Sequence, residues 1–283
     1  MPYIETAPGV QVFVQDWGQG EPLVFLHGWP LSHEMFEYQT NQLASHYRCI
    51  LIDRRGFGHS DKPWANYDYD TLTDDLHAVL EALELENVTL VGFSMGGGEA
   101  IHYFGRHHGD RVSKLVLLAP AGPRLLKADD FEEGVDKDTF NEMIEGTVSD
   151  RAAFLEDFSK KFFGITLLSN PVSSKLAEWF HSLGMAAASK ATADCVVTFS
   201  QADLREDVAK INVPTLIIQG TADQIVPFAI SAQVLNESIS NSQLIAYDGA
   251  PHGFFYTEWP RLNQDLMAFL QTPVLNEIPG TVW

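Results

Sequence analysis

The sequence predicts an α/β fold built on a mostly parallel sheet. Three observations lead to this prediction: short apolar segments alternate with segments of helical periodicity, a Gly-x-Ser-x-Gly motif joins one such segment to a helix, and one long helical stretch interrupts the alternation. Alternation of this kind places helices against parallel strands. With 283 residues, 45% of them hydrophobic, the chain is long enough for one large or two small domains with a sizeable core.

Apolar, β-branched segments predict the strands, and apolar residues three or four positions apart predict the helices. The predicted strands are 10–16, 23–26, 48–52, 88–93, 114–119, 215–219 and 243–247. The predicted helices are 34–45, 69–83, 95–107, 228–236 and 259–270, and the tail 273–283 is expected to be irregular. The connection from Asp16 to Pro22 is short enough for a hairpin, so we expect the first two of these strands to be antiparallel.

Between the strands at 114–119 and 215–219 lie roughly ninety residues of helical periodicity, too many for an unstructured loop. We therefore predict a helical cap over residues 122–212 and a core made of residues 1–121 and 213–283. The cap is rich in Phe, and most of its apolar side chains are expected to pack in its interior. Some of them should line the substrate pocket, since small-molecule pockets are mainly apolar.

The strongest chemical signal is the segment Gly92-Phe93-Ser94-Met95-Gly96, in which Ser94 lies between a predicted strand and a predicted helix. A turn of this kind forces the serine backbone into unfavourable dihedral angles, and the residues two positions away must be almost free of side chains. Gly92 and Gly96 supply that clearance. Ser94 is therefore the candidate nucleophile.

A serine nucleophile needs a base, and the base needs a group that holds its tautomer. Among ten histidines, His252 lies in a loop rich in Gly and Pro that follows the last predicted strand. Asp223 directly follows the strand at 215–219, although it is also suited to be the N-cap of the next helix. Each candidate thus follows a different strand, in the chain order Ser, Asp, His.

Attack on a carbonyl also requires N–H donors that stabilise the oxyanion. We expect these donors to be the peptide groups of Trp29 and Met95. Trp29 belongs to the loop His27-Gly28-Trp29-Pro30, which follows a buried strand. Met95 opens the predicted helix, where the first N–H groups have no intrahelical acceptor and the helix dipole is positive.

Other polar residues have structural interpretations. His27, beside Gly28 in a buried turn, is expected to be a hydrogen-bonding residue of that turn. The segment 53–59 contains two glycines and predicts a strand-end turn held by ion pairs and hydrogen bonds. Several histidines in helical segments lack metal-ligand spacing and are expected to be solvated or capping: His77, His102, His107, His108 and His181. We therefore expect no metal site.

Charge and composition narrow the class of protein. The formal net charge of −20 disfavours nucleic acid and anionic membrane surfaces as partners. Cys49 and Cys195 make no disulfide framework, and no apolar stretch approaches the ~20 residues that span a bilayer. Because no charged and then apolar segment follows Met1, we expect no secretory leader. We expect a cytoplasmic protein that binds a small-molecule substrate, and homo-oligomer formation stays open.

From residue 10 to residue 269 the chain resembles an α/β-hydrolase in these motifs. The segments Trp29-Pro30-Leu31-Ser32, Asp53-Arg54-Arg55-Gly56 and 92–99 are similar to those of cofactor-free bacterial chloroperoxidases and aryl esterases. The resemblance implies an eight-stranded, mostly parallel sheet flanked by helices, with a helical cap insertion. It also implies a catalytic triad and oxyanion donors at these positions: Ser94, Asp223, His252, Trp29 and Met95.

For function, the resemblance implies hydrolysis of carboxylic esters through an acyl-enzyme, with neither metal nor cofactor. An alternative is a perhydrolase or haloperoxidase that makes peracids from hydrogen peroxide, because in this family proline after the oxyanion-loop tryptophan accompanies peracid formation, and Pro30 holds that position. Lactone or amide hydrolysis and a non-catalytic receptor on the same fold are further alternatives. Epoxide hydrolases and dehalogenases share this layout but use an aspartate nucleophile, whereas this chain has Ser94.

Overall fold

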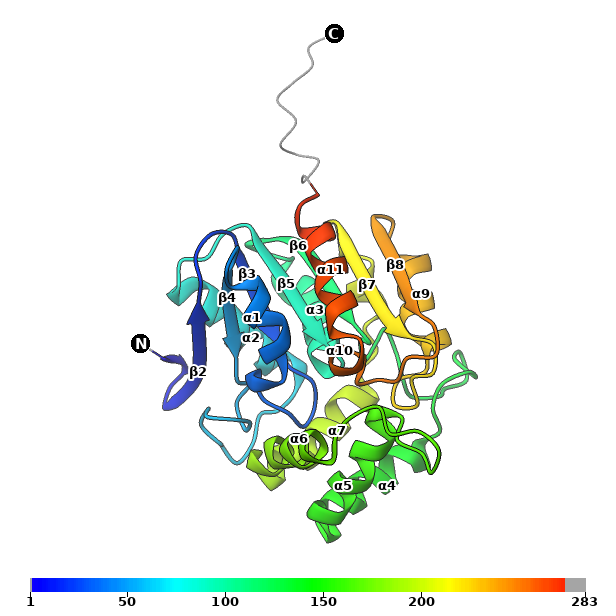
Figure 1. Cartoon of the computed structure of the whole chain (residues 1–283). Coiled ribbons are helices and arrows are strands. Elements are labelled where there is room, and N and C mark those ends of the chain that lie inside the picture. The colour runs from blue at the N-terminus through cyan, green and yellow to red at the C-terminus, as the bar shows by residue number, and fades with distance from the viewer. Residues whose placement is uncertain (1, 273–283) are drawn as a thin grey trace, which may run out of the picture.

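A computed structural model describes residues 2–272; Met1 and residues 273–283, and with them the tail predicted to be irregular, lie outside the described residues. Eight strands form one sheet in the order β1-β2-β4-β3-β5-β6-β7-β8 (Figure 1). Strands β3 to β8 are parallel to one another, as the sequence predicts. The strands are β1 (Tyr3–Ala7), β2 (Val10–Trp17), β3 (Pro22–Leu26), β4 (Arg48–Ile52), β5 (Val88–Phe93), β6 (Val112–Leu118), β7 (Thr215–Gly220) and β8 (Ser242–Tyr247).

The order of the first strands corrects one expectation. β2 is antiparallel to the strands that follow, but it pairs with β4, while the neighbours of β3 are β4 and β5. The predicted hairpin between β2 and β3 is therefore wrong. The hairpin that does form joins β2 to β1, a strand absent from the prediction. Only Ile4 is buried among the five residues of β1, so its sequence carries little apolar pattern.

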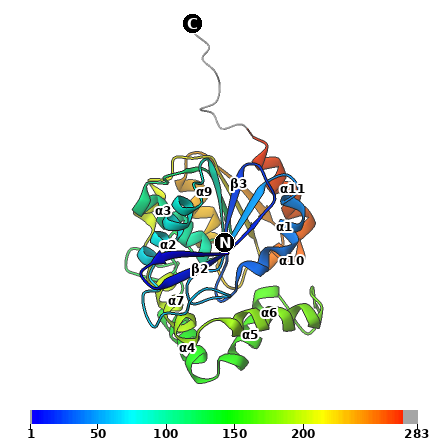
Figure 2. The same ribbon diagram turned by 90° about the vertical axis from the view of Figure 1, so that its left-hand side faces the viewer.

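Helices cover both faces of the sheet (Figure 2). α1 (Glu37–Leu43) packs against α11 (Trp259–Leu270) on one face. On the other face lie α2 (Tyr69–Ala82), α3 (Met95–His107) and α9 (Ala232–Ser238). The helices α1 and α9 begin later than predicted because a 3₁₀ turn precedes each of them, η1 (His33–Phe36) before α1 and η2 (Phe228–Ile230) before α9. Two further helices are single turns, α8 (Arg205–Val208) and α10 (Phe254–Thr257).

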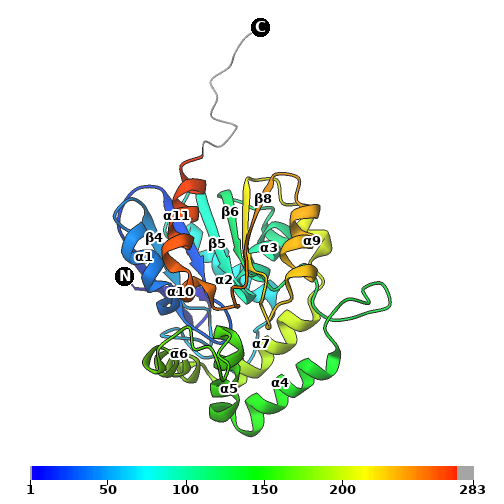
Figure 3. The ribbon, with the colours of Figure 1, turned by 45° about the vertical axis from the view of Figure 1, so that its right-hand side comes forward.

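Four more helices lie beyond the end of the sheet at which β5 leads into α3 (Figures 1 and 3). In one of them, residues 151–163, both ends follow from the sequence. The side chain of Asp150 accepts from the N–H of Ala153 at its start, and Gly164 ends it in the left-handed conformation. The division into a core and a cap over 122–212 stays a prediction. Within the described residues no helix is long and apolar enough to cross a membrane. The four helices are α4 (Lys137–Ser149), α5 (Arg151–Phe163), α6 (Ser174–Ala186) and α7 (Ser189–Gln201).

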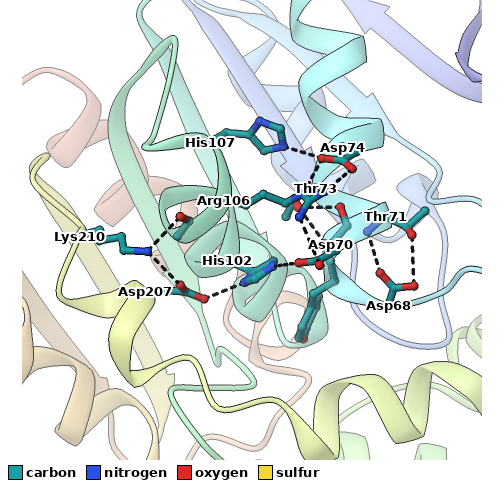
Figure 4. A network of polar contacts seen from close by, with 12 residues as sticks. Asp68, Asp70, Thr71, Thr73, Asp74, His102, Arg106, His107, Asp207 and Lys210 are labelled. Carbon is teal, nitrogen blue, oxygen red and sulfur yellow. Dashed lines mark hydrogen bonds and ion pairs between the residues drawn. The ribbon is translucent and has the colours of Figure 1, made fainter.

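A network of charged side chains joins α2, α3 and α8 (Figure 4). The Nδ1 atom of His102 lies 2.7 Å from Asp207 Oδ2, and its Nε2 atom lies 2.7 Å from Asp70 Oδ1. His107 Nε2 lies 2.9 Å from Asp74 Oδ1. These histidines tie neighbouring helices together, so the expectation of solvated or capping residues is wrong for them.

The segment after β4 is a hydrogen-bonded turn, as the sequence predicts. Asp53 is fully buried, and its Oδ1 atom accepts from the peptide N–H of His33 at 2.7 Å and pairs with the ring Nδ1 of His33 at 2.8 Å. Its Oδ2 atom accepts from the peptide N–H of His59 at 2.8 Å. Burial raises the pKa of the Asp53 carboxyl, but the hydrogen bonds and positive charge of His33 outweigh burial and lower the pKa to about 2. Asp53 therefore stays ionised and keeps its hydrogen bonds within the turn.

Candidate active site

Ser94 lies at a sharp turn between β5 and α3, and its backbone has φ 53° and ψ −118°. Residues other than glycine rarely adopt this conformation, so the turn is strained. A Cβ atom on Gly92 would collide with the backbone of Gly96 and Gly97, and one on Gly96 would collide with the carbonyl groups of Leu26 and His27. The clearance predicted for Gly92 and Gly96 is therefore present, and only glycine fits at either position.

The structure brings Ser94, His252 and Asp223 together from three different strand ends. Ser94 Oγ lies 3.0 Å from His252 Nε2, and His252 Nδ1 lies 2.7 Å from Asp223 Oδ2. All three residues are buried. Because a carboxylate only accepts hydrogen bonds, Nδ1 of His252 carries the proton and Nε2 is free to accept from the serine hydroxyl.

Asp223 is not a helix N-cap, because the next helix, η2, begins at Phe228 and has Pro227 at its N-cap position. The Asp223 carboxylate instead has further donors. Its Oδ1 atom accepts from the peptide N–H groups of Ile225 and Val226, each at 2.9 Å. Its Oδ2 atom accepts from Nε2 of Gln219 at 3.1 Å in addition to His252. The sequence analysis assigned no role to Gln219. The signal was a polar residue inside the otherwise apolar strand β7, four positions before the aspartate.

His27 has a structural environment, as expected, and stays neutral. Its Nε2 atom accepts from the peptide N–H of Arg54 at 3.0 Å, so its Nδ1 atom donates to the carbonyl of Gly28 at 2.9 Å. Burial and the nearby positive charge of Arg54 lower the pKa of His27 to about 3. A histidine held in this way cannot act as the base of Ser94.

A buried ion pair between Arg54 and Glu99 holds the loop that contains His27. The guanidinium of Arg54 donates to the carboxylate of Glu99 at 2.7 Å and to the carbonyl of His27 at 2.9 Å. Both side chains of the pair are 4% exposed. Glu99 lies on α3, so this pair ties the helix after Ser94 to the loop that contains Trp29.

The two expected oxyanion donors are available. Neither the peptide N–H of Trp29 nor that of Met95 has a protein acceptor within residues 2–272. The Trp29 side chain is fixed, since its Nε1–H donates to the carbonyl of Thr192 at 2.9 Å and its ring packs edge-on against Phe158. The peptide bond from Trp29 to Pro30 is cis.

A narrow cavity of about 30 Å³ adjoins Ser94. This volume equals the space that about two water molecules occupy. Among the described residues no charged side chain lines it, and helices α4, α5 and α7 contribute Phe140 and Met143, Phe158, and Phe199 to its lining. The lining residues are Trp29, Ser94, Ala121, Leu125, Phe140, Met143, Phe158, Phe199, Ile225 and Val226.

Two other features lie away from Ser94. A cavity of about 890 Å³ is lined by residues at the amino ends of the parallel strands, among them Thr89 and Pro214, whereas Ser94 follows the carboxyl end of β5. The side chains of His33, Asp53 and His59 have metal-ligand atoms within 4.8 Å of one another. The hydrogen bonds to His33 and His59 already satisfy the Asp53 carboxylate, so this cluster needs no ion to be stable.

Comparison with known proteins gives consistent relatives. The sequence model of the family described as alpha/beta hydrolase fold matches residues 21–258. The AB hydrolase superfamily protein YisY of Bacillus subtilis is 44% identical over 268 residues, which cover 94% of this chain and 98% of that protein. A putative non-heme chloroperoxidase of Synechocystis is 41% identical, and a bifunctional esterase/perhydrolase of Acinetobacter calcoaceticus is 37% identical; each match covers 96% of this chain and 100% of the relative.

Two solved structures are close in both fold and sequence. The bromoperoxidase from Bacillus anthracis has a TM-score of 0.92 and 42% identity, and the esterase from Exiguobacterium antarcticum has a TM-score of 0.90 and 39% identity. Each comparison covers 95% of this chain and 99% of the other. Names of both esterases and haloperoxidases therefore occur among the relatives, and the expected resemblance is confirmed. The chain belongs to the alpha/beta hydrolase fold family.

Proposed function

We propose that this chain is a serine esterase that cleaves small, uncharged carboxylic esters through an acyl-enzyme. In this proposal Ser94 is the nucleophile, His252 is the general base and then the general acid, and Asp223 orients His252 and stabilises its cation. The observation that carries the proposal is the continuous chain of hydrogen bonds, 3.0 Å from Ser94 to His252 and 2.7 Å from His252 to Asp223.

The proposed chemistry has two steps. Ser94 Oγ attacks the ester carbonyl carbon while its proton passes to His252 Nε2. The tetrahedral intermediate then collapses, and the alcohol leaves with that proton. Water repeats the sequence on the acyl-enzyme, which releases the carboxylic acid and restores the Ser94 hydroxyl.

Trp29 and Met95 are the proposed oxyanion donors. Their peptide N–H groups have no acceptor among the described residues, so they are available to the negative charge that develops on the carbonyl oxygen. The Met95 N–H belongs to the first turn of α3, where the helix dipole adds to this stabilisation.

The lining of the cavity supports the proposed substrate class. It offers apolar side chains and the Ser94 hydroxyl, without a charged partner for an ionised substrate. An unpaired charge buried in such a site is costly, which favours uncharged over charged acyl groups. A volume of about 30 Å³ favours acetyl and other short acyl groups over long chains.

Active-site labelling tests this proposal. A fluorophosphonate probe should label wild-type protein at Ser94 alone, and Ser94→Ala should abolish both labelling and hydrolysis of 4-nitrophenyl acetate. Ser200→Ala is the matched control, because among residues 2–272 that buried hydroxyl bonds only to the Val197 carbonyl on α7. Hydrolysis that persists in Ser94→Ala, or labelling of another serine, contradicts the proposed nucleophile.

A second candidate activity is perhydrolysis, in which hydrogen peroxide replaces water as the acceptor of the acyl group and a peracid leaves the enzyme. Two observations favour it: Pro30 follows Trp29, and relatives 41% and 37% identical are named putative non-heme chloroperoxidase and bifunctional esterase/perhydrolase. Halide oxidation would then be a consequence of the released peracid.

The ratio of peracid to acid, measured at a fixed peroxide concentration, tests this second activity. We expect peracid from wild-type protein and a lower ratio from Pro30→Leu. Addition of EDTA should change neither product. If the ratio is the same in both proteins while ester hydrolysis continues, Pro30 is only a residue of the turn.

A further inference from the structure

We propose that Gln219 is a positioning residue of the triad, acting on His252 through Asp223. This inference rests on the function proposed above. Gln219 is the penultimate residue of β7, and its side chain is fully buried. It touches neither Ser94 nor His252 by a hydrogen bond, so any effect on chemistry passes through the carboxylate.

Three hydrogen bonds fix the orientation of the Gln219 amide. Its Nε2 atom donates to the carbonyl of Val226 at 2.7 Å and to Asp223 Oδ2 at 3.1 Å. Its Oε1 atom accepts from the peptide N–H of Ala232 at 3.2 Å. Because the first two partners only accept and the third only donates, the reversed amide would break all three bonds.

With Gln219 in place, every acceptor position of the Asp223 carboxylate is occupied. The peptide groups of Ile225 and Val226 take Oδ1, and Gln219 and His252 share Oδ2. Rotation of the carboxylate away from this position would break these four hydrogen bonds. The amide also draws part of the negative charge of Oδ2 away from the imidazole, which limits how strongly Asp223 stabilises protonated His252.

Few groups besides Asp223 act on the His252 ring. Its hydrogen-bond partners are Asp223 and Ser94. The rings of Phe93 and Phe162 pack against it, with ring centroids 4.9 and 5.0 Å from the centroid of the imidazole. Asp223 is the one charged group among these contacts. A change in the acid limb of the activity profile therefore reports the hydrogen bond between Asp223 and His252.

Replacement of Gln219 by methionine keeps the volume and removes the donor. In Gln219→Met, Oδ2 should hold the imidazolium more strongly, so the acid limb of kcat/KM should move upward by about 0.5 to 1 pH unit. On the alkaline plateau kcat should fall about tenfold with KM unchanged, because Asp223 keeps only three of its four hydrogen bonds and orients the neutral base less tightly.

Ser231→Ala is the matched control. Ser231 is equally buried beside the same turn, and its hydroxyl donates to the carbonyl of Pro120 at 2.6 Å without touching Asp223. This variant should lose thermal stability as Gln219→Met does, and its acid limb should not move. If both variants leave the acid limb in place, Gln219 is merely structural and the inference is overturned.

A second measurement does not depend on turnover. The proton between His252 and Asp223 can be followed through its downfield NMR resonance. This resonance and the titration of the His252 ring are compared in wild-type protein, Gln219→Met and Gln219→Asn. Both variants should shift the titration upward even if no ester is a substrate. A shifted titration without ester hydrolysis would overturn the proposed function alone, and an unshifted titration with normal hydrolysis would overturn the role of Gln219 alone.

Discussion

The buried carboxylate of Asp53 should make a pH-dependent contribution to stability that can be isolated in one variant. Its pKa is lowered from 3.8 to about 2, because hydrogen bonds and charge from His33 outweigh the effect of burial. Since the folded value lies below the unfolded one, the stabilisation is complete above about pH 4 and is lost as the pH falls through about 2. At 1.36 kcal/mol per unit, the full contribution is about 2.5 kcal/mol.

Asp53→Asn removes this contribution while it keeps the shape of the side chain. In urea unfolding, the free energy of unfolding of the variant should be at least about 2.5 kcal/mol below that of wild type at pH 7. At pH 3 this difference should be smaller by about 1 kcal/mol. Asp61→Asn controls for the loss of a carboxylate, because Asp61 is exposed in the same turn. A gap between wild type and Asp53→Asn that stays constant from pH 7 to pH 3 would refute the reasoning.

The remaining predictions concern the loop below Ser94, the turn itself and the cavity. Glu99→Ala leaves the Arg54 guanidinium buried without its carboxylate, so urea unfolding should show a loss of about 3 to 5 kcal/mol. Gly96→Ala forces a methyl group against the Leu26 carbonyl and should abolish esterase activity even in protein whose circular dichroism shows a folded state. Met143→Ala enlarges the cavity, so the rate ratio of 4-nitrophenyl butyrate to acetate should rise about tenfold or more. Its neighbour Ile144, which lines a different surface depression, provides the control variant Ile144→Ala.

Much of the fold could be predicted from the sequence because local patterns determine it. The central strands are buried on both faces and are therefore continuously apolar, as in β5 and β7. The residues Ser94, Asp223 and His252 were identified because each follows a predicted strand, and the carboxyl ends of parallel strands meet at one edge. Their juxtaposition in space agrees with that reasoning.

The features that the sequence did not reveal depend on partners distant along the chain. The neighbours of β2 are set by the insertion of β4 beside β3, which no local pattern encodes. The bonds from His102 to Asp70 and Asp207 join three helices, so spacing within one helix cannot predict them. Gln219 is a similar case, since its donors and acceptors meet it only when the turn after β7 folds back.

Helix α5 is linked directly to the loop that carries the proposed base. The carbonyl of Phe162 accepts from the peptide N–H of Gly253 at 2.7 Å, and the Phe162 ring packs against His252. A movement of α5 that admitted an ester would therefore break these contacts to His252 and its loop when the substrate binds. Helix α4 holds Phe140 and Met143 over the cavity, yet within residues 2–272 it makes no hydrogen bond to the loops of the triad. Movement of α4 would therefore leave the triad assembled, and changes in α4 should alter KM while changes at Phe162 also alter kcat.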